Sequence, residues 1–504
     1  MSEPLNTSRR WLALSVLCLS LLLVVIDNTI VNVALPTLNR DLGAGTTDLQ
    51  WIVDAYTLVF SALLLTMGHL GDRFGRRRAL QVGLVLFAVT SLLAALSSTS
   101  GQLIGARALM GIGAALIFPA TLAILVNVFT DAKERAAAIG IWTAMVGVAV
   151  AVGPVAGGFL LEHFAWGAIF MVNIPVVVIA LLLGAVLLPE SRDPNSGSLD
   201  YLGLALSTGG VGLIVWAIIE APQRGWLSAG IVAALVVGAA LLTVFVFVER
   251  RLLHPMLDVR LFKNARFTAA SLSVTTAFFA LFGFIFLITQ FLQLVQGYTP
   301  LQAGIRTLPF AVATGVTSPL AIVLMQRFGS KAIVTLGLLV MAAGFVMAAT
   351  VSVDTPYLGI VVLSMVTIAA GLGLATSPAT ESIMGALPPE QAGAGAAVND
   401  TTRELGGTLG VAVVGSVFLS VYGSQVGDAY RSLGLPQRFE SIVAESMGGG
   451  LRVAERLPSG QGAQLAAVVR SAFIDGLSRG SLVAAAVVAV GAVVAWLFLP
   501  ARAD

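Results

Sequence analysis

The most regular feature of the chain is the alternation of long apolar stretches with short polar segments. A helix that crosses the hydrocarbon core of a bilayer needs about 20 consecutive, mostly apolar residues. Fourteen stretches meet this requirement. The pattern therefore predicts an all-α integral membrane protein with fourteen transmembrane helices, which start near Trp11, Trp51, Ala79, Gln102, Arg135, Trp166, Tyr201, Ser228, Phe267, Gly304, Lys331, Tyr357, Ala392 and Gly476.

Two short motifs occur twice, in the same order. Arg73–Arg77 (Arg-Phe-Gly-Arg-Arg) returns as Arg327–Lys331 (Arg-Phe-Gly-Ser-Lys), and the Pro-Ala-Thr of Pro119–Thr121 returns at Pro378–Thr380. In each half the basic motif joins the second predicted helix to the third, and Pro-Ala-Thr lies on the fourth. Internal repeats of this kind build the two bundles of many transporters. A chance match within the small alphabet of membrane helices is the alternative, but it does not account for the shared order.

The repeat also predicts how the chain is divided. We expect two pseudo-symmetric six-helix bundles and, between them, an inserted helix pair, at residues 1–199, 251–504 and 200–250, respectively. The longest polar segment, residues 423–475, separates the last two predicted helices. Its run Gly448-Gly449-Gly450 predicts a mobile extracellular loop, with a short helix near Ala463–Phe473.

Composition agrees with a membrane protein and excludes other classes. The chain is 57% hydrophobic and 11% charged, whereas a soluble domain carries about a quarter charged residues. The net charge of +2 argues against nucleic acid as a partner, and one cysteine with three scattered histidines predicts no metal site. With the N-terminus in the cytoplasm, the short outer loops hold only Arg40 and Arg224. The positive-inside rule therefore places both termini in the cytoplasm.

Three charged residues are predicted inside the membrane, in one layer. Asp27 lies about 24 Å along the first helix, while Asp54 and Arg107 lie about 4–5 Å and 7–8 Å from the outer ends of theirs. An ionised side chain in hydrocarbon costs several kcal/mol, so each should face a cavity or a partner.

Burial favours the neutral form of a carboxyl group, and a nearby guanidinium favours the charged form. We therefore predict that Asp27 carries a proton, with Arg107 tuning it, and that a cationic substrate competes for the same negative site. Replacing Asp27 by Asn is expected to leave folding intact and to abolish coupled transport. The alternative is that each carboxylate forms a static ion pair near the membrane–water interface. This alternative has more weight for Asp54 than for Asp27.

The loop Gly68–Leu80 predicts a gate. Its glycines Gly68, Gly71 and Gly75 permit a tight turn, and its charged residues are Asp72, Arg73, Arg76 and Arg77. Asp72 can pair with Arg73 or Arg76, or accept backbone N–H groups at the start of the next helix. A plain positive-inside anchor is the alternative, but it explains neither Asp72 nor the glycines.

A second glycine-containing motif lies inside the fifth predicted helix, at Gly153, Pro154, Gly157 and Gly158. A proline bends a helix and glycines permit close helix contact, so the motif predicts a hinge or a seal between the halves. Ordinary small-residue packing is the alternative.

The substrate cavity is less clearly marked. The ninth predicted helix carries six phenylalanines, which together cover all of its faces. We expect most of them to pack against lipid or neighbouring helices. In the thirteenth, either Asn399 with Arg403 or Asp400 with Glu404 faces inward, and the sequence does not decide between the pairs. The cavity candidates are Asn32, Trp142, Phe282, Gln290, Asn399 and Arg403.

Three of these segments resemble motifs of a known family. Gly68–Leu80 resembles the loop signature of the major facilitator superfamily. Asp27–Pro36 and Gly153–Gly158 are similar to the first-helix and fifth-helix motifs of its fourteen-helix drug:proton antiporters. The resemblance extends over the whole chain, including the inserted pair.

The resemblance implies a proton-driven multidrug efflux antiporter of the plasma membrane. Its substrates would be small amphipathic cationic drugs and dyes, such as fluoroquinolones, ethidium, acriflavine and quaternary ammonium compounds, exchanged for H+. It would need no cofactor beyond the proton gradient. The two pseudo-symmetric halves within one chain predict a functional monomer in the lipid bilayer.

Other functions are less well supported by the sequence. The chain has no phosphate-binding lysine loop and no dinucleotide motif, which argues against an enzyme and against ATP as the energy source. A proton-coupled exporter of an endogenous lipid, siderophore or metabolite, with incidental drug transport, shares every feature and stays open. A nutrient importer fits the Gly153–Gly158 motif less well, and a receptor leaves Asp27 and Arg107 unexplained.

Overall fold

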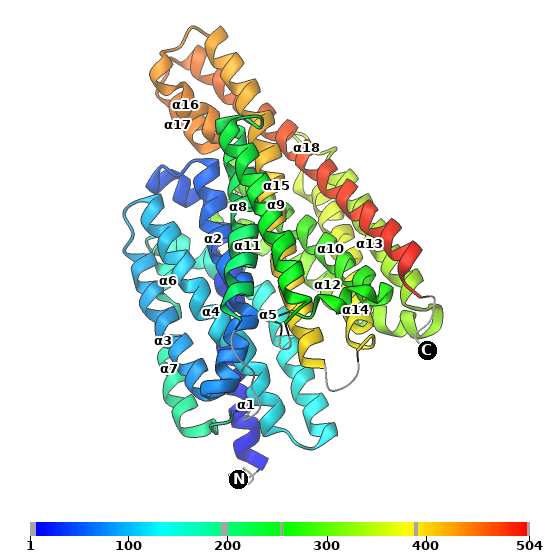
Figure 1. Cartoon of the computed structure of the whole chain (residues 1–504). Coiled ribbons are helices and arrows are strands. Elements are labelled where there is room, and N and C mark those ends of the chain that lie inside the picture. The colour runs from blue at the N-terminus through cyan, green and yellow to red at the C-terminus, as the bar shows by residue number, and fades with distance from the viewer. Residues whose placement is uncertain (1–6, 193–199, 253–254, 256, 388–391, 501–504) are drawn as a thin grey trace.

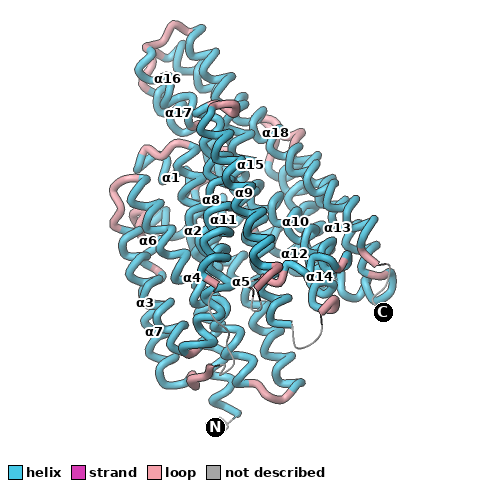
Figure 2. Tube along the Cα trace, in the orientation of Figure 1, coloured by secondary structure: helices cyan, strands magenta, loops and turns pink. Residues whose placement is uncertain are grey.

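The computed structural model describes residues 7–192, 200–252, 255, 257–387 and 392–500. Within these residues all regular elements are helices, and fourteen are long and apolar enough to cross a membrane, as the sequence predicts (Figure 2). Figure 1 shows both ends of the chain at one end of the bundle, here called the terminal face. α16 and α17 lie at the other end, called the opposite face. The predicted boundary at 199 and the last residues at each chain end lie outside the described residues.

The first six apolar stretches form the helices of the first bundle. Side chains cap their starts where the chain enters a new helix: Thr99 accepts a hydrogen bond from the Gln102 N–H (3.3 Å), and Asp131 accepts one from the Glu134 N–H (2.9 Å). The helices are α1 (Thr7–Leu42), α2 (Thr46–Phe74), α3 (Arg76–Ala95), α4 (Ser100–Val128), α5 (Ala132–His163), α6 (Ala168–Met171) and α7 (Asn173–Leu187).

The inserted pair is α8 (Tyr201–Arg224) and α9 (Ala229–Glu249), and α8 packs on both α2 and α15. The second bundle repeats the six-span plan, with short helical turns added. Its elements are η1 (Val259–Lys263), α10 (Ala265–Gln290), η2 (Phe291–Val295), α11 (Pro300–Arg306), α12 (Leu308–Phe328), α13 (Ser330–Ala348), η3 (Tyr357–Val361), α14 (Val362–Met384), α15 (Ala392–Ser432), η5 (Gln437–Phe439), α16 (Glu440–Glu445), α17 (Met447–Glu455) and α18 (Ser459–Phe498).

The repeated sequence motifs occupy equivalent places in the two bundles. The basic turn between the second and third helices contains a glycine with positive φ in both, Gly75 at +118° and Gly329 at +86°. The third and fourth helices then approach through glycines in both. A Cβ on Gly83 would lie 3.0 Å from the Gly113 carbonyl oxygen, and one on Gly371 would lie 2.6 Å from that of Gly337. The pseudo-symmetry predicted from the repeats is therefore present in the packing.

Residues 423–475, predicted to be a loop, are helical over most of their length, so the loop prediction was wrong, whereas the helix expected near Ala463–Phe473 is present within α18. α15 continues to Ser432, and α18 begins at Ser459 rather than near Gly476. Tyr422, Val426 and Tyr430 recur every four residues and are buried along one side of α15. The Tyr422 hydroxyl donates to the Val443 carbonyl oxygen (3.0 Å), so this stripe holds the returning chain against α15.

The glycine run also has a different role from the predicted one. Gly448, Gly449 and Gly450 lie in α17, whose first turn is capped by Ser446 (3.0 Å from the Gly449 N–H). A Cβ on Gly450 would lie 2.8 Å from the Val469 side chain in α18. The glycine run is therefore part of a helix, and Gly450 permits its close packing against α18.

We call residues 433–458 the cap segment, and it binds the first bundle. Asn39 in α1 donates to the Ser446 hydroxyl (2.9 Å), and the Thr46 hydroxyl donates to the Glu445 carbonyl oxygen (2.6 Å). The two bundles also contact each other at other places near the opposite face. The Gln293 amide donates to the Val33 carbonyl oxygen (2.9 Å). In addition, α2 packs against α15, and α5 packs against α11. The structure therefore has its two bundles joined on the side of the opposite face.

Candidate functional site

Asp27 and Arg107, predicted to lie in one layer, form an ion pair in which neither side chain is exposed. Asp27 comes from the middle of α1 and Arg107 from α4. The other carboxylate oxygen of Asp27 accepts a hydrogen bond from the Asn173 amide (3.1 Å), which also donates to the Ser91 hydroxyl (3.2 Å). The pair and its hydrogen-bond partners thus come from four helices of the first bundle, α1, α3, α4 and α7. This fits the requirement that buried charges be paired and hydrogen-bonded.

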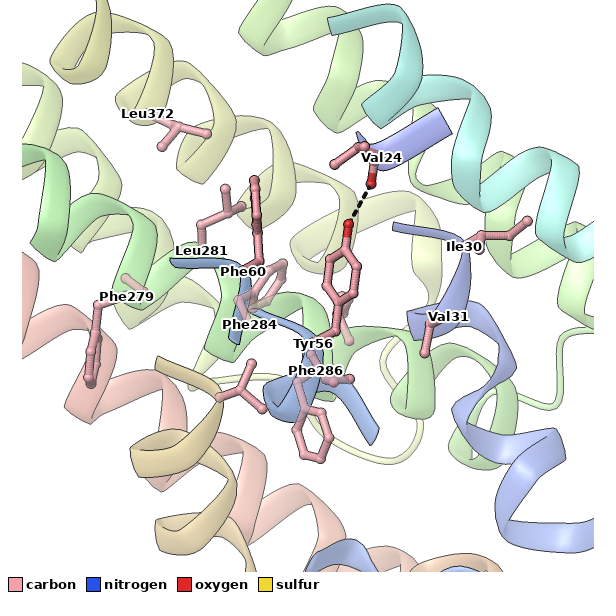
Figure 3. Close-up of a cluster of buried hydrophobic side chains, with 14 of the residues drawn as sticks. Val24, Ile30, Val31, Tyr56, Phe60, Phe279, Leu281, Phe284, Phe286 and Leu372 are labelled. Atoms are coloured by element: carbon pink, nitrogen blue, oxygen red, sulfur yellow. Dashed lines mark hydrogen bonds between the residues drawn. The ribbon is translucent and has the colours of Figure 1, made fainter. Parts of the chain in front are cut away.

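The guanidinium of Arg107 is held on its other sides by α2. Its Nε–H donates to the Ile52 carbonyl oxygen (3.1 Å), and its carbon atom lies 4.2 Å from the centre of the Tyr56 ring. The Tyr56 hydroxyl donates to the Val24 carbonyl oxygen of α1 (3.3 Å), as Figure 3 shows. The ring is therefore fixed in place as a cation–π partner for the arginine.

Asp54 is fully buried but does not join the pair. Neither of its carboxylate oxygens has a hydrogen-bond partner among the described residues. It lies between Gln50 and Thr57 on one face of α2. That face contacts the second bundle: Gln50 donates to the Ala412 carbonyl oxygen (3.1 Å), and Thr57 accepts from the Thr408 hydroxyl (3.0 Å). The structure thus places Asp54 at the interface between the bundles.

The predicted gating loop forms a charged turn at the terminal face. Asp72 pairs with Arg76 (2.7 Å), one of the two partners predicted for it, while Arg73 lies over the Phe74 ring. A Cβ on Gly68 or Gly71 would make only ordinary contacts, with Pro119 at 3.6 Å and Ala79 at 3.4 Å, so packing alone does not require glycine at either position.

A further acid, Glu190 after α7, binds this turn, and sequence reasoning missed it. Its carboxylate accepts a hydrogen bond from the Arg77 N–H (3.1 Å) and lies 3.7 Å from the Arg78 guanidinium. Nothing in the sequence marks Glu190 except that it is an acid in a loop on the same predicted side.

We expect Gly75→Ala to destabilise the protein by about 1–3 kcal/mol, the usual cost of a side chain held at positive φ. The backbone at Gly75 has φ +118°, and a Cβ there would lie 2.7 Å from the Glu190 carboxylate. Thermal unfolding in detergent measures the change. Gly101→Ala is the matched control, because that glycine lies in a helix with nothing within 4 Å of its Cβ position. Equal unfolding temperatures for the two variants would show that the turn adapts freely.

The glycine motif of α5 packs against both α1 and the second bundle. Cβ atoms on Gly153 and Gly157 would lie 2.0 and 2.6 Å from the Thr29 and Ile30 side chains of α1. One on Gly158 would lie 2.5 Å from the Leu301 Cα of α11. In return, a Cβ on Gly304 would lie 2.2 Å from the Pro154 carbonyl oxygen. The motif therefore lies where α5 and α11 touch backbone to backbone, and Gly304 is its unpredicted counterpart.

The six cavity candidates do not form one cluster. Asn32 and Gln290 are buried and donate to carbonyl oxygens of their own helices, at Asn28 (3.0 Å) and Phe286 (2.8 Å). Phe282 packs on Gly407. Most of the other phenylalanines of α10 are buried in the core, as expected; Phe279, Phe284 and Phe286 appear in Figure 3.

The remaining candidates occupy equivalent sites in the two bundles. Trp142 in α5 donates to the Thr121 hydroxyl of α4 (3.2 Å), and Arg403 in α15 donates to the Thr380 hydroxyl of α14 (3.2 Å). Both threonines belong to the repeated Pro-Ala-Thr. Thr380 also donates to Asn399 (3.1 Å), so Asn399 and Arg403 face α14. Glu404 lies one turn before Thr408, on the side of α15 that faces α2.

Comparisons with known proteins agree with this architecture. The model of the Major Facilitator Superfamily matches residues 17–411. The chain is 41% identical to the multidrug efflux pump LfrA of Mycolicibacterium smegmatis over 98% of this chain and 97% of that protein. It is 36% identical to the methyl viologen resistance protein SmvA of Salmonella typhimurium over 92% of this chain and 93% of that protein.

Among solved structures, the chain resembles a bacterial homologue of the human lysosomal transporter Spinster, crystallised in an inward-facing and unoccupied conformation. The TM-score is 0.66 at 18% identity, and the match covers 99% of both chains. At this identity the likeness concerns the fold alone. From the family match and the near full-length relatives, we conclude that the chain belongs to the Major Facilitator Superfamily and is a multi-pass membrane transporter.

Proposed function

We propose that this transporter is a proton-driven multidrug efflux antiporter that exports cationic, amphipathic compounds in exchange for H+. The observation that carries the proposal is the buried Asp27–Arg107 pair, because a charged pair inside a membrane bundle usually marks an ion pathway. The names of the relatives support the substrate class, since one is a multidrug efflux pump and another confers resistance to methyl viologen, an organic dication.

In this proposal a proton competes with the arginine for Asp27. Protonation neutralises the carboxylate, and Arg107 is then left to the Ile52 carbonyl oxygen and the Tyr56 ring. A cationic compound in the cavity favours the ionised carboxylate, and a proton opposes it. If the bundles expose the site to the two faces in turn, binding of the two cations becomes coupled, because each shifts the same equilibrium.

The proposal also includes the orientation of the protein in the membrane and its oligomeric state. We place the terminal face in the cytoplasm, because the arginine-rich turns Arg73–Arg78 and Arg327–Lys331 lie there. Both bundles that form the pathway belong to one chain, so we propose a functional monomer in the plasma membrane. The proton gradient is the energy source, without a cofactor.

Ethidium transport into proteoliposomes that hold only this protein tests the proposal. We expect inside-out molecules to accumulate the dye when the lumen is acidic, and an ionophore that collapses the gradient to abolish accumulation. Transport of dye that is indifferent to the pH gradient would contradict proton coupling. No dye or quaternary ammonium transport under any gradient would contradict the multidrug function and favour an endogenous substrate.

A further inference from the structure

Glu190 connects two parts of the first bundle that are far apart in sequence. It follows α7 by three residues and contacts the first turn of α3. One carboxylate oxygen accepts from the Arg77 N–H (3.1 Å), and the other lies 3.9 and 3.7 Å from the Nε atoms of Arg77 and Arg78. Next to it, the Ser191 carbonyl oxygen accepts from the Arg76 N–H (2.9 Å). The tail of α7 is therefore hydrogen-bonded to two successive backbone N–H groups.

The chemistry of this contact favours a carboxylate. The first N–H groups of a helix have no partner within the helix, and the helix dipole makes this end attractive to negative charge. Two arginine side chains add to the attraction. Asp72, the other acid of the turn, is already paired with Arg76 at 2.7 Å. Glu190 thus neutralises the part of the turn that Asp72 does not.

Among the described residues, the second bundle has a related contact without an acid. There the equivalent turn meets the end of α18, which is the sixth helix of that half. The Ser330 hydroxyl lies 3.5 Å from the Pro500 carbonyl oxygen, and the Lys331 ammonium lies 4.8 Å from the centre of the Trp496 ring. Each basic turn is therefore attached to the sixth helix of its own bundle, through a carboxylate in one and an aromatic ring in the other.

From these contacts we infer that Glu190 is a positioning residue for transport. It fixes the basic turn to α7, so that the turn and α7 move as one body when the bundles change their relative orientation. α3 packs on α2, α4, α6 and α7, all in the first bundle, which agrees with a turn that is held by its own half. The role in transport rests on the proposed function, whereas the attachment itself does not.

Hydrogen exchange at the start of α3 tests the attachment without any transport assay. In Glu190→Gln, which keeps an acceptor oxygen but removes the charge, we expect the backbone amides of Arg76, Arg77 and Arg78 to exchange about tenfold faster, because a hydrogen bond to a charged group contributes more than one to a neutral group. Glu134→Gln is the matched control, because Glu134 also pairs with an arginine near the terminal face, Arg10, at 2.7 Å. Unchanged exchange in Glu190→Gln would overturn the inference.

Efflux kinetics test the positioning role. We expect Glu190→Gln to lower the maximal rate of ethidium efflux about tenfold, with KM and the thermal unfolding temperature unchanged and with recovery in Glu190→Asp. A higher KM at an unchanged maximal rate would assign Glu190 to substrate binding, and an unchanged rate would remove its role; either result overturns the inference. If the wild-type protein exports no dye, the proposed function fails, while the exchange measurement still judges the attachment.

Discussion

Asp27→Asn will reduce proton-coupled efflux to the level of empty liposomes, and it will also destabilise the protein. The structure changes the second part of the expectation that the sequence suggested. Arg107 is fully buried and its ion-pair partner is Asp27. Removing one partner of a buried pair leaves an uncompensated charge, which typically costs about 3–5 kcal/mol. Efflux under an imposed pH gradient and unfolding by denaturant measure the two effects.

A second substitution separates the loss of coupling from the loss of stability. In Asp27→Asn with Arg107→Gln, no buried charge remains at this site, so we expect most of the stability to return while coupled efflux stays absent. Asp41→Asn is the matched control on the same helix, because Asp41 pairs with Arg40 at an exposed site. Such pairs contribute about 0–1 kcal/mol. Coupled efflux that survives in the double variant would contradict the role of Asp27 as the proton carrier.

Gly304→Ala will disfavour closure of the bundles at the opposite face and will thereby slow transport strongly. The new Cβ would lie 2.2 Å from the Pro154 carbonyl oxygen, a backbone atom that cannot move without its helix. Overpacking of this kind costs about 1–3 kcal/mol. A cost of that size shifts a two-state equilibrium by about 5- to 150-fold. We therefore expect the population to move toward a state that is open at the opposite face.

Thiol labelling reports this shift directly. The only native cysteine, Cys18, is buried, and Thr57 lies at the interface between α2 and α15. In a Thr57→Cys background, we expect Gly304→Ala to accelerate labelling by a membrane-impermeant maleimide from the opposite face. Gly315→Ala, in the same span but with nothing within 4 Å of its Cβ position, should leave labelling unchanged. Equal labelling in both variants, together with normal efflux, would show that α5 and α11 tolerate a side chain at their contact.

The sequence predicts the spans and the repeats correctly because both are local properties. Twenty apolar residues define a span regardless of what they touch, and the motif around Gly75 encodes a turn that returns at Gly329. The same logic identified Asp27 and Arg107, since a charge within an apolar stretch is visible without knowing its partner.

Contacts between distant segments are what the sequence does not reveal. Glu190 meets Arg77 across 113 residues, and Gly304 meets Pro154 across the two bundles. Neither residue is unusual in its own segment. The helices flanking and filling residues 423–475 escaped the sequence analysis for a different reason. Above the membrane a helix buries only one side, so Tyr422 and Tyr430 are interleaved with polar residues and the average hydropathy falls.

The inserted pair has a consequence for how substrates reach the interior. α8 hydrogen-bonds to both bundles near the opposite face, from Gln223 to Thr47 (2.9 Å) and from Ser416 to the Ile218 carbonyl oxygen (2.7 Å). It thereby covers the lateral seam between α2 and α15, whereas, within the described residues, α8 and α9 have no comparable packing on α5 and α12. A compound dissolved in the bilayer therefore meets two unlike flanks. The flank at α5 and α12 lacks this cover, so we expect uptake from the membrane to favour that side despite the near-symmetry of the bundles.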